Sequence, residues 1–131
     1  MAQSVTPFLM FEGMAEEAIG FYISLFPGSE IVQIERYAAG EPGREGSVKR
    51  ANFTLCGRNY ICIDSPIKHQ FTFTPAFSLF VDCQDETEFD RAFTALSESG
   101  GVLMPPANYG FSRKFGWLND RFGVSWQINL V

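Results

Sequence analysis

The chain has 131 residues, of which 46% are hydrophobic and 19% are charged, and its formal net charge is −5. This length suits one domain with a single core, and the composition is far from that of a disordered chain. The ten Lys and Arg residues are scattered. Because no basic stripe is available for a phosphate backbone, we expect no nucleic-acid partner.

Three cysteines, Cys56, Cys62 and Cys83, form an odd set without CxxC spacing. This pattern argues against a disulfide framework and a thiolate zinc site, and it favours reduced thiols in a cytoplasm. The first seven residues lack a basic stretch followed by an apolar run, and eighteen apolar residues nowhere stand together. The sequence therefore predicts a cytoplasmic protein with neither a secretion signal nor a membrane span.

The first half of the chain predicts one strand, one helix and three further strands. These are a strand at 8–11, a helix at 14–26, a strand at 30–37 and a hairpin with strands at 51–56 and 60–64. Glu16 and Glu17 suit the dipole at the helix start, and Pro27-Gly28 ends the helix. Residues 38–46 carry three glycines, which predicts a mobile connection. Gly57-Arg58-Asn59 is expected to form the hairpin turn.

The second half repeats this order after a polar link at 65–75. The expected elements are a strand at 76–82, a helix opened by Asp85, and strands at 102–104, 115–118 and 124–130. Asp85 and Glu88 have the spacing of a capping box. A shift of seventy positions places Leu9 on Leu79 and Phe11 on Val81, although the shared element order is the better evidence for a repeat. We predict an α+β fold with two tandem βαβββ units, about 5–65 and about 75–131, in a single domain of residues 1–131.

Three segments carry a resemblance to a known family. They are the run from Gly13 to Tyr22, the run from Phe71 to Val81 and the run from Gly116 to Ile128. Together they resemble the PhnB-like branch of the vicinal oxygen chelate superfamily, which includes glyoxalase I, extradiol dioxygenases, fosfomycin-resistance enzymes and bleomycin-binding proteins. The resemblance implies two βαβββ units whose curved mixed sheets form a cupped, barrel-like site, usually completed in a homodimer.

The resemblance also implies where a metal would bind, since enzymes of the superfamily hold a divalent ion with His, Glu or Gln from the first and last strands of each unit. The position on the last strand falls on Gln127, and hairpin symmetry pairs it with Cys62. Alternation puts six residues of the opening strands on the inward face: Thr6, Phe8, Met10, Ala76, Ser78 and Phe80. None of the six is a histidine or a carboxylate. We therefore expect no catalytic metal and no other cofactor, although a Cys62 thiolate would suit zinc.

The candidate ligand contacts combine these positions with the tryptophans of the last hairpin. They are Phe8, Met10, Cys62, Ser78, Phe80, Trp117, Trp126 and Gln127. Five of them have a structural alternative: the tryptophans can be core residues, Gln127 a buried amide and Ser78 a strand hydroxyl satisfied by neighbours, and Cys62 a small core hydrophobe.

Cys62 and His69 are the candidate catalytic residues. His69 is the only histidine, and its side chain titrates near neutrality, as a general base requires. A histidine in a linker, however, is usually a solvated surface residue. A triad of Ser78, His69 and Asp64 lacks the GxSxG nucleophile elbow and is not favoured.

Two functions follow from this sequence. The first is a metal-free protein of the bleomycin-binding kind that holds an apolar or aromatic small molecule. The alternative is an enzyme of the same superfamily, of lyase, dioxygenase or transferase type, with an altered, non-chelating site. Members of the branch are often labelled 3-demethylubiquinone methyltransferases, but no strand here is followed by a GxGxG-type loop for S-adenosylmethionine.

Overall fold

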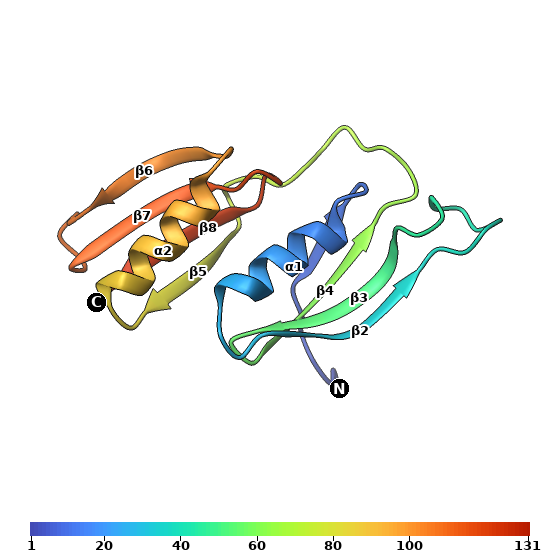
Figure 1. Ribbon diagram of the computed structural model, residues 1–131, viewed down its shortest axis with the longest axis horizontal. Helices are drawn as coiled ribbons and strands as arrows, with labels where there is room; N and C mark the ends of the chain where they lie inside the picture. Colours follow the sequence, from blue (N-terminus) through green and yellow to red (C-terminus); the bar gives the residue numbers. More distant parts are fainter. The chain divides into compact units, whose positions relative to one another are not determined.

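The computed structural model describes residues 1–131, which divide into two compact units, Met1–His69 and Gln70–Val131. The first unit contains β1 (Phe8–Phe11), α1 (Ala15–Leu25), β2 (Glu30–Arg36), β3 (Val48–Leu55) and β4 (Arg58–Asp64). The second contains β5 (Ser78–Cys83), α2 (Glu86–Ser97), β6 (Gly101–Ala107), β7 (Lys114–Asn119) and β8 (Ser125–Leu130). Each unit is therefore a βαβββ unit (Figure 1), as the sequence predicts.

The two sheets have the same topology. Their strand orders are β1-β4-β3-β2 and β5-β8-β7-β6. In each sheet the first and last strands of the unit pair in parallel, and the other neighbours pair antiparallel. This repetition confirms the predicted fold class. Neither helix is long and apolar enough to cross a membrane.

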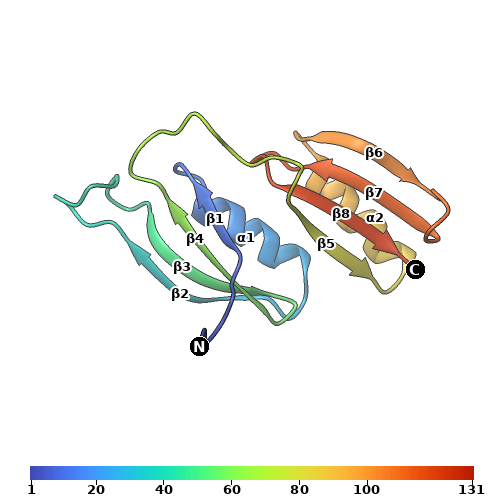
Figure 2. The same ribbon diagram turned by 180° about the vertical axis from the view of Figure 1, so that it is seen from behind.

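Each helix packs on one face of its own sheet (Figures 1 and 2). In the first unit Ile19 and Tyr22 of α1 are fully buried, and Leu9 of β1 is nearly so. In the second unit α2 lies against β7, where a Cβ on Gly116 would come within 2.4 Å of a ring carbon of Phe93. Burying each large apolar side chain contributes about 1.5–3 kcal/mol, so these helix-covered faces are the cores of the two units.

The two helices begin in different ways. Asp85 is the N-cap of α2, and its Oδ1 accepts the Glu88 N–H at 2.8 Å while the Glu88 carboxylate accepts the Gln84 N–H. This arrangement confirms the capping box. Met14, the N-cap of α1, makes no side-chain cap. The start of α1 is capped instead by the side chain of Asp64, at the end of β4.

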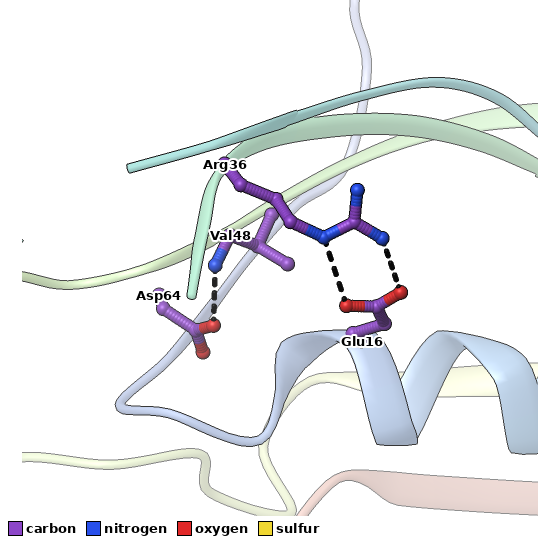
Figure 3. Close-up of polar contacts among 4 residues, drawn as sticks. All are labelled: Glu16, Arg36, Val48 and Asp64. Carbon is purple, nitrogen blue, oxygen red and sulfur yellow. Dashed lines mark hydrogen bonds and ion pairs between the residues drawn. The ribbon is translucent and has the colours of Figure 1, made fainter. Parts of the chain in front are cut away.

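The Asp64 carboxylate is buried and accepts three backbone hydrogen bonds. Its Oδ1 accepts the N–H groups of Gly13 at 2.7 Å and Ala15 at 3.0 Å, before and at the start of α1. Its Oδ2 accepts the Val48 N–H at 2.9 Å, at the start of β3 (Figure 3). One side chain thus joins the ends of β4 and β1, the start of α1 and the start of β3.

Several strand boundaries differ by one to three residues from the sequence prediction: β3 begins at Val48 and β5 at Ser78, for example. Two other differences have a clear physical reason. The β3–β4 turn is formed by Cys56 and Gly57, with φ of 51° and 82°, so β4 begins at Arg58 and not at residue 60. Consecutive positive φ values are typical of a type I′ hairpin turn, which glycine allows and cysteine rarely adopts. Strand β6 runs past residue 104 through Pro105 and Pro106. It is an edge strand, and its pairing with β7 is irregular between Met104 and Ala107; edges and bulges are the places in a sheet where proline is tolerated.

The glycine-rich connection after β2 is folded against Tyr37, contrary to the predicted mobile loop. Backbone bonds join Tyr37 N–H to Ser47 and Gly46 N–H to Tyr37. A Cβ on Gly43 would come within 2.2 Å of the Tyr37 ring, so only glycine allows this close approach. The Tyr37 hydroxyl in turn donates to the backbone oxygen of Asp64 at 3.1 Å.

Removing the Asp64 carboxylate should destabilise the protein strongly. Asp64→Ala leaves three backbone donors without their acceptor, and we expect a loss of about 3 kcal/mol or more in the free energy of unfolding. Asp85→Ala, which removes one local cap, should cost about 1 kcal/mol. Urea denaturation of the full chain measures both. A loss for Asp64→Ala no larger than that for Asp85→Ala would contradict the central role of Asp64.

Candidate functional site

The candidate site is the face of the second unit's sheet that α2 does not cover, here called the helix-free face. Strand residues alternate between faces, and Gly116 marks the side that faces α2. The pairing of β5, β8 and β7 places the other set of side chains in three rows. The rows are Ser78, Ser125 and Asn119; then Phe80, Gln127 and Trp117; then Asp82, Asn129 and Phe115.

The first row is organised around the Ser125 hydroxyl. Ser125 Oγ lies 2.7 Å from Ser78 Oγ and accepts the indole N–H of Trp117 at 2.8 Å. The Ser125 side chain is buried, and Ser78 and Trp117 are half-buried. The hydroxyl predicted at Ser78 is therefore satisfied by its neighbour, and Trp117 is fixed with its ring on the helix-free face.

Two amide oxygens of this face have no hydrogen-bond partner. They are Oδ1 of Asn119 and Oδ1 of Asn129. Asn129 is only 7% exposed, and its Nδ2 donates to Asp82 Oδ1 at 2.9 Å. Since an ionised carboxylate can only accept, this bond fixes which way the Asn129 amide points. A buried acceptor left unpaired costs about 1–3 kcal/mol, so both oxygens call for an explanation.

An aromatic cluster lies beside the third row and consists of Phe80, Tyr109, Phe111 and Phe115. The Phe115 ring is buried, and its centroid lies 5.0 Å from that of Phe111, 6.2 Å from Tyr109 and 6.4 Å from Phe80. Tyr109 and Phe111 belong to the loop between β6 and β7. Phe80 is 55%, Tyr109 39% and Phe111 63% exposed, so three of the four residues offer ring surface to a partner.

The predicted contact residues fall into two groups. Ser78, Phe80, Trp117 and Gln127 lie on the helix-free face, as the rows show. In the first unit Phe8 and Met10 pair with Ile61 and Ile63, and they lie on the face of that sheet turned away from α1. Cys62 and Trp126 lie on the helix-covered faces.

Cys62 is not the counterpart of Gln127, which corrects the hairpin comparison by one residue. Cys62 pairs with Leu9, and all its surface is buried on the α1 side. Gln127 pairs with Phe80, and the matching strand position in the first unit, opposite Met10, is Ile63. Burial and then the Asp64 charge raise the pKa of the Cys62 thiol to about 12. A buried thiol beneath a helix that is held in its neutral form packs as a core residue.

The Trp126 side chain forms a hydrogen bond with the turn between β7 and β8. Its indole N–H donates to Asp120 Oδ2 at 2.9 Å, and it is 1% exposed. Asp120 Oδ1 accepts the N–H groups of Phe122 at 2.8 Å and Val124 at 3.0 Å. Trp126 therefore packs in the core of the second unit, against the prediction that it lines a ligand site.

His69 contacts two other residues of the first unit. Its Nε2 lies 2.8 Å from Ser65 Oγ, and its backbone N–H donates to Glu12 at 3.2 Å. Asp64, the third member of the triad considered from the sequence, is engaged with backbone N–H groups. The hydrogen bonds of Ser78, His69 and Asp64 therefore go to other partners.

The donors at the family's metal positions do not form a chelating set. Gln127 offers one amide oxygen, Phe80 offers none, and Ile63 has no ligating atom. No group of three or more His, Cys, Asp or Glu is placed to hold a metal ion. A protein site for a divalent metal normally needs three protein ligands, so the side chains at these positions do not fit a divalent metal ion.

Asp82, Asn119, Ser125 and Asn129 were not identified from the sequence. A signal was present in residues 125–130, where Ser, Gln and Asn alternate with Trp, Ile and Leu. Such alternation marks a strand with one apolar and one polar face. It predicts the polar face, but the orphan oxygens depend on neighbours from β5 and β7.

Comparisons with known proteins agree with this fold. The family model described as 3-demethylubiquinone-9 3-methyltransferase matches residues 3–129. The PhnB protein of Bacillus cereus, which carries the same methyltransferase name, is 57% identical, with a TM-score of 0.96 over 98% of this chain and 100% of that chain. Protein YjdN of Escherichia coli is 26% identical over 97% of this chain and 95% of its own length. Fosfomycin resistance protein FosX of Mesorhizobium loti, 9% identical, shares the fold with a TM-score of 0.62 over 98% of this chain and 92% of that chain.

The fold and these likenesses define a protein of the vicinal oxygen chelate superfamily. Within it, the chain belongs to the 3-demethylubiquinone-9 3-methyltransferase family, the PhnB-like branch.

The placement of the cysteines predicts their reactivity. Cys56 is exposed, whereas Cys62 and Cys83 are buried and burial raises the pKa of each to about 12. With a disulfide reagent at about pH 8, we expect one thiol per chain to react in the native protein, and all three after unfolding, because thiolates are the reactive species. Peptide mapping should place the native label on Cys56. Rapid native labelling of Cys62 would reopen its candidacy as a reactive residue.

Proposed function

We propose that this protein binds a small apolar or aromatic molecule on the helix-free face of its second unit. The observation that carries the proposal is the row of Asp82, Asn129 and Phe115, where an unpaired, buried amide oxygen lies beside an aromatic cluster. Apolar ring surface with a few fixed polar atoms is the usual composition of a small-molecule site. Ligand binding also explains why unpaired acceptors are retained, since a ligand donor would satisfy them.

We further propose that binding takes place without a catalytic metal. The support is the donor set, in which Gln127 is matched by Ile63, Phe80 has no ligating atom, and the Met10 thioether is a poor ligand for hard divalent ions. The methyltransferase name of the family is a weaker guide for this chain. Its sheets are mixed, and no glycine-rich loop follows a parallel strand in the manner of a dinucleotide-type fold.

The two tryptophans provide an internal test of the binding face. Trp117 donates its indole N–H on the helix-free face, whereas Trp126 donates on the helix-covered face. In ¹H–¹⁵N spectra, titration with small neutral aromatic alcohols should shift the Trp117 indole resonance several times more than that of Trp126. Trp117→Phe assigns the two signals. Larger shifts at Trp126, or none at either indole for every alcohol tested, would contradict the proposed site.

The isolated protein should be a homodimer that contains little metal. Dimerisation is proposed from the superfamily resemblance, and light scattering at micromolar concentration should give twice the mass of the 131-residue chain. Elemental analysis of the same sample should find well under one divalent metal ion per chain, and added divalent metals should raise the melting temperature only slightly. A monomer mass would remove the dimer from the proposal, and stoichiometric metal would remove its metal-free character.

A further inference from the structure

We propose that the ligand carries a protonated amine, which is held at the third row of the helix-free face by Asp82 and the aromatic cluster. The inference rests on the proposed binding function and names the chemical class of its ligand. Its basis is that the Asp82 carboxylate and the Asn129 amide oxygen accept hydrogen bonds, and that the aromatic rings beside them attract a cation.

Asp82 supplies the charge. Its Oδ1 accepts the Asn129 amide at 2.9 Å, and its residue is exposed at the sheet surface. Oδ2 has no such bond within the chain and is left to accept from a ligand. A hydrogen bond between an ammonium and a carboxylate is roughly twice as strong as one between neutral groups.

Asn129 adds a second acceptor beside this carboxylate. Because its Nδ2 is committed to Asp82, its unpaired Oδ1 must point elsewhere. An amine with several N–H donors matches this pair of acceptors better than a ligand with a single hydroxyl. A carboxylate or phosphate ligand would find no donor at either oxygen.

The aromatic cluster provides the third element of cation recognition. Phe80 is two residues before Asp82 on the same strand face, and Phe115 is the register partner of Asn129. Phe111 extends the ring surface toward solvent. Aromatic faces attract organic ammonium groups, and the rings would also hold an apolar part of the ligand.

The cations of the second unit form no ion pair with Asp82, and these include Arg113, an exposed residue directly before β7. Lys114 lies on the α2 side, where its Nζ is 2.8 Å from Asp90 and 4.9 Å from the Phe89 ring centroid. The Arg121 guanidinium lies 4.5 Å from the Phe122 ring centroid. Asp82 forms no ion pair within the chain. Its negative charge is therefore available to a ligand.

Three probes of similar size test the inference: 2-phenylethylammonium, 2-phenylethanol and 3-phenylpropionate. Binding of each to the full chain at neutral pH and low salt can be measured by the chemical shifts of the Trp117 indole and of residues 80–82. We expect the ammonium probe to bind at least about tenfold more tightly than the carboxylate probe, with the alcohol between them.

Two exposed positions and one control separate the contributions. Asp82→Asn should lower affinity for the ammonium probe about tenfold and leave the alcohol nearly unchanged. Phe111→Leu, which keeps apolar bulk but removes the ring, should weaken the ammonium probe more than the alcohol. Asp90→Asn, which removes a surface carboxylate on the α2 side, should change neither.

The outcomes distinguish this inference from the proposed function. Equal binding of all three probes, or preference for the carboxylate, would overturn the amine assignment and leave small-molecule binding in place. Ammonium binding that is unaffected by Asp82→Asn would also overturn it. Failure of every probe to perturb the Trp117 face would count against both.

Discussion

Each unit has one helix for a four-stranded sheet, and a helix can cover only one face of a sheet. This constraint fixes the rest of the architecture. Side chains that alternate toward the helix, such as Cys62, Gly116 and Trp126, become core, and their neighbours in sequence are left on the other face. The polar side chains on that second face must therefore find hydrogen-bond partners other than the helix. In the second unit Ser78 pairs with Ser125 and Asn129 pairs with Asp82 across the strands, but two buried amide oxygens have no partner, and they point to the candidate site.

In both units an aspartate side chain accepts hydrogen bonds from N–H groups at the start of the helix, but the two aspartates come from different places in the unit. The first turn of α2 is capped locally, since Asp85 and Glu88 bond to backbone groups within four residues. The start of α1 is capped by Asp64, 49 residues from Ala15 in sequence. The local cap stabilises one helix, whereas the long-range cap makes α1, β3 and β4 depend on one carboxylate. Cooperative folding of the first unit follows from that dependence, since α1 cannot keep its cap if β4 separates from β1.

The sequence predicts what is local and misses what is set by register. The element order, both helices and the Asp85 cap follow from periodicity and spacing within a few residues. Hairpin symmetry matches Cys62 with Gln127 because both precede an isoleucine near the end of a hairpin. The strand pairing instead puts Ile63 at the position equivalent to Gln127. A shift of one residue in a strand exchanges core for surface, so the one-residue mismatch assigns a core thiol to the candidate site. The capping role of Asp64 is not predictable either, because a single aspartate at a strand end does not indicate which distant N–H groups it will bind.

The register also explains why the polar chemistry concentrates in the second unit. In the first unit the positions that pair with Phe8 and Met10 are Ile61 and Ile63, so the centre of that face is apolar. In the second unit the corresponding positions carry Ser125 and Gln127, and the next row adds Asn129 beside Asp82. Serine, glutamine and asparagine side chains on adjacent strands could have satisfied one another fully, as Ser78 and Ser125 do. Asn129 instead donates to Asp82 and leaves its buried oxygen unpaired on the row that holds Phe115. This arrangement is costly for a face with a purely structural role and suitable for a face that receives a hydrogen-bond donor.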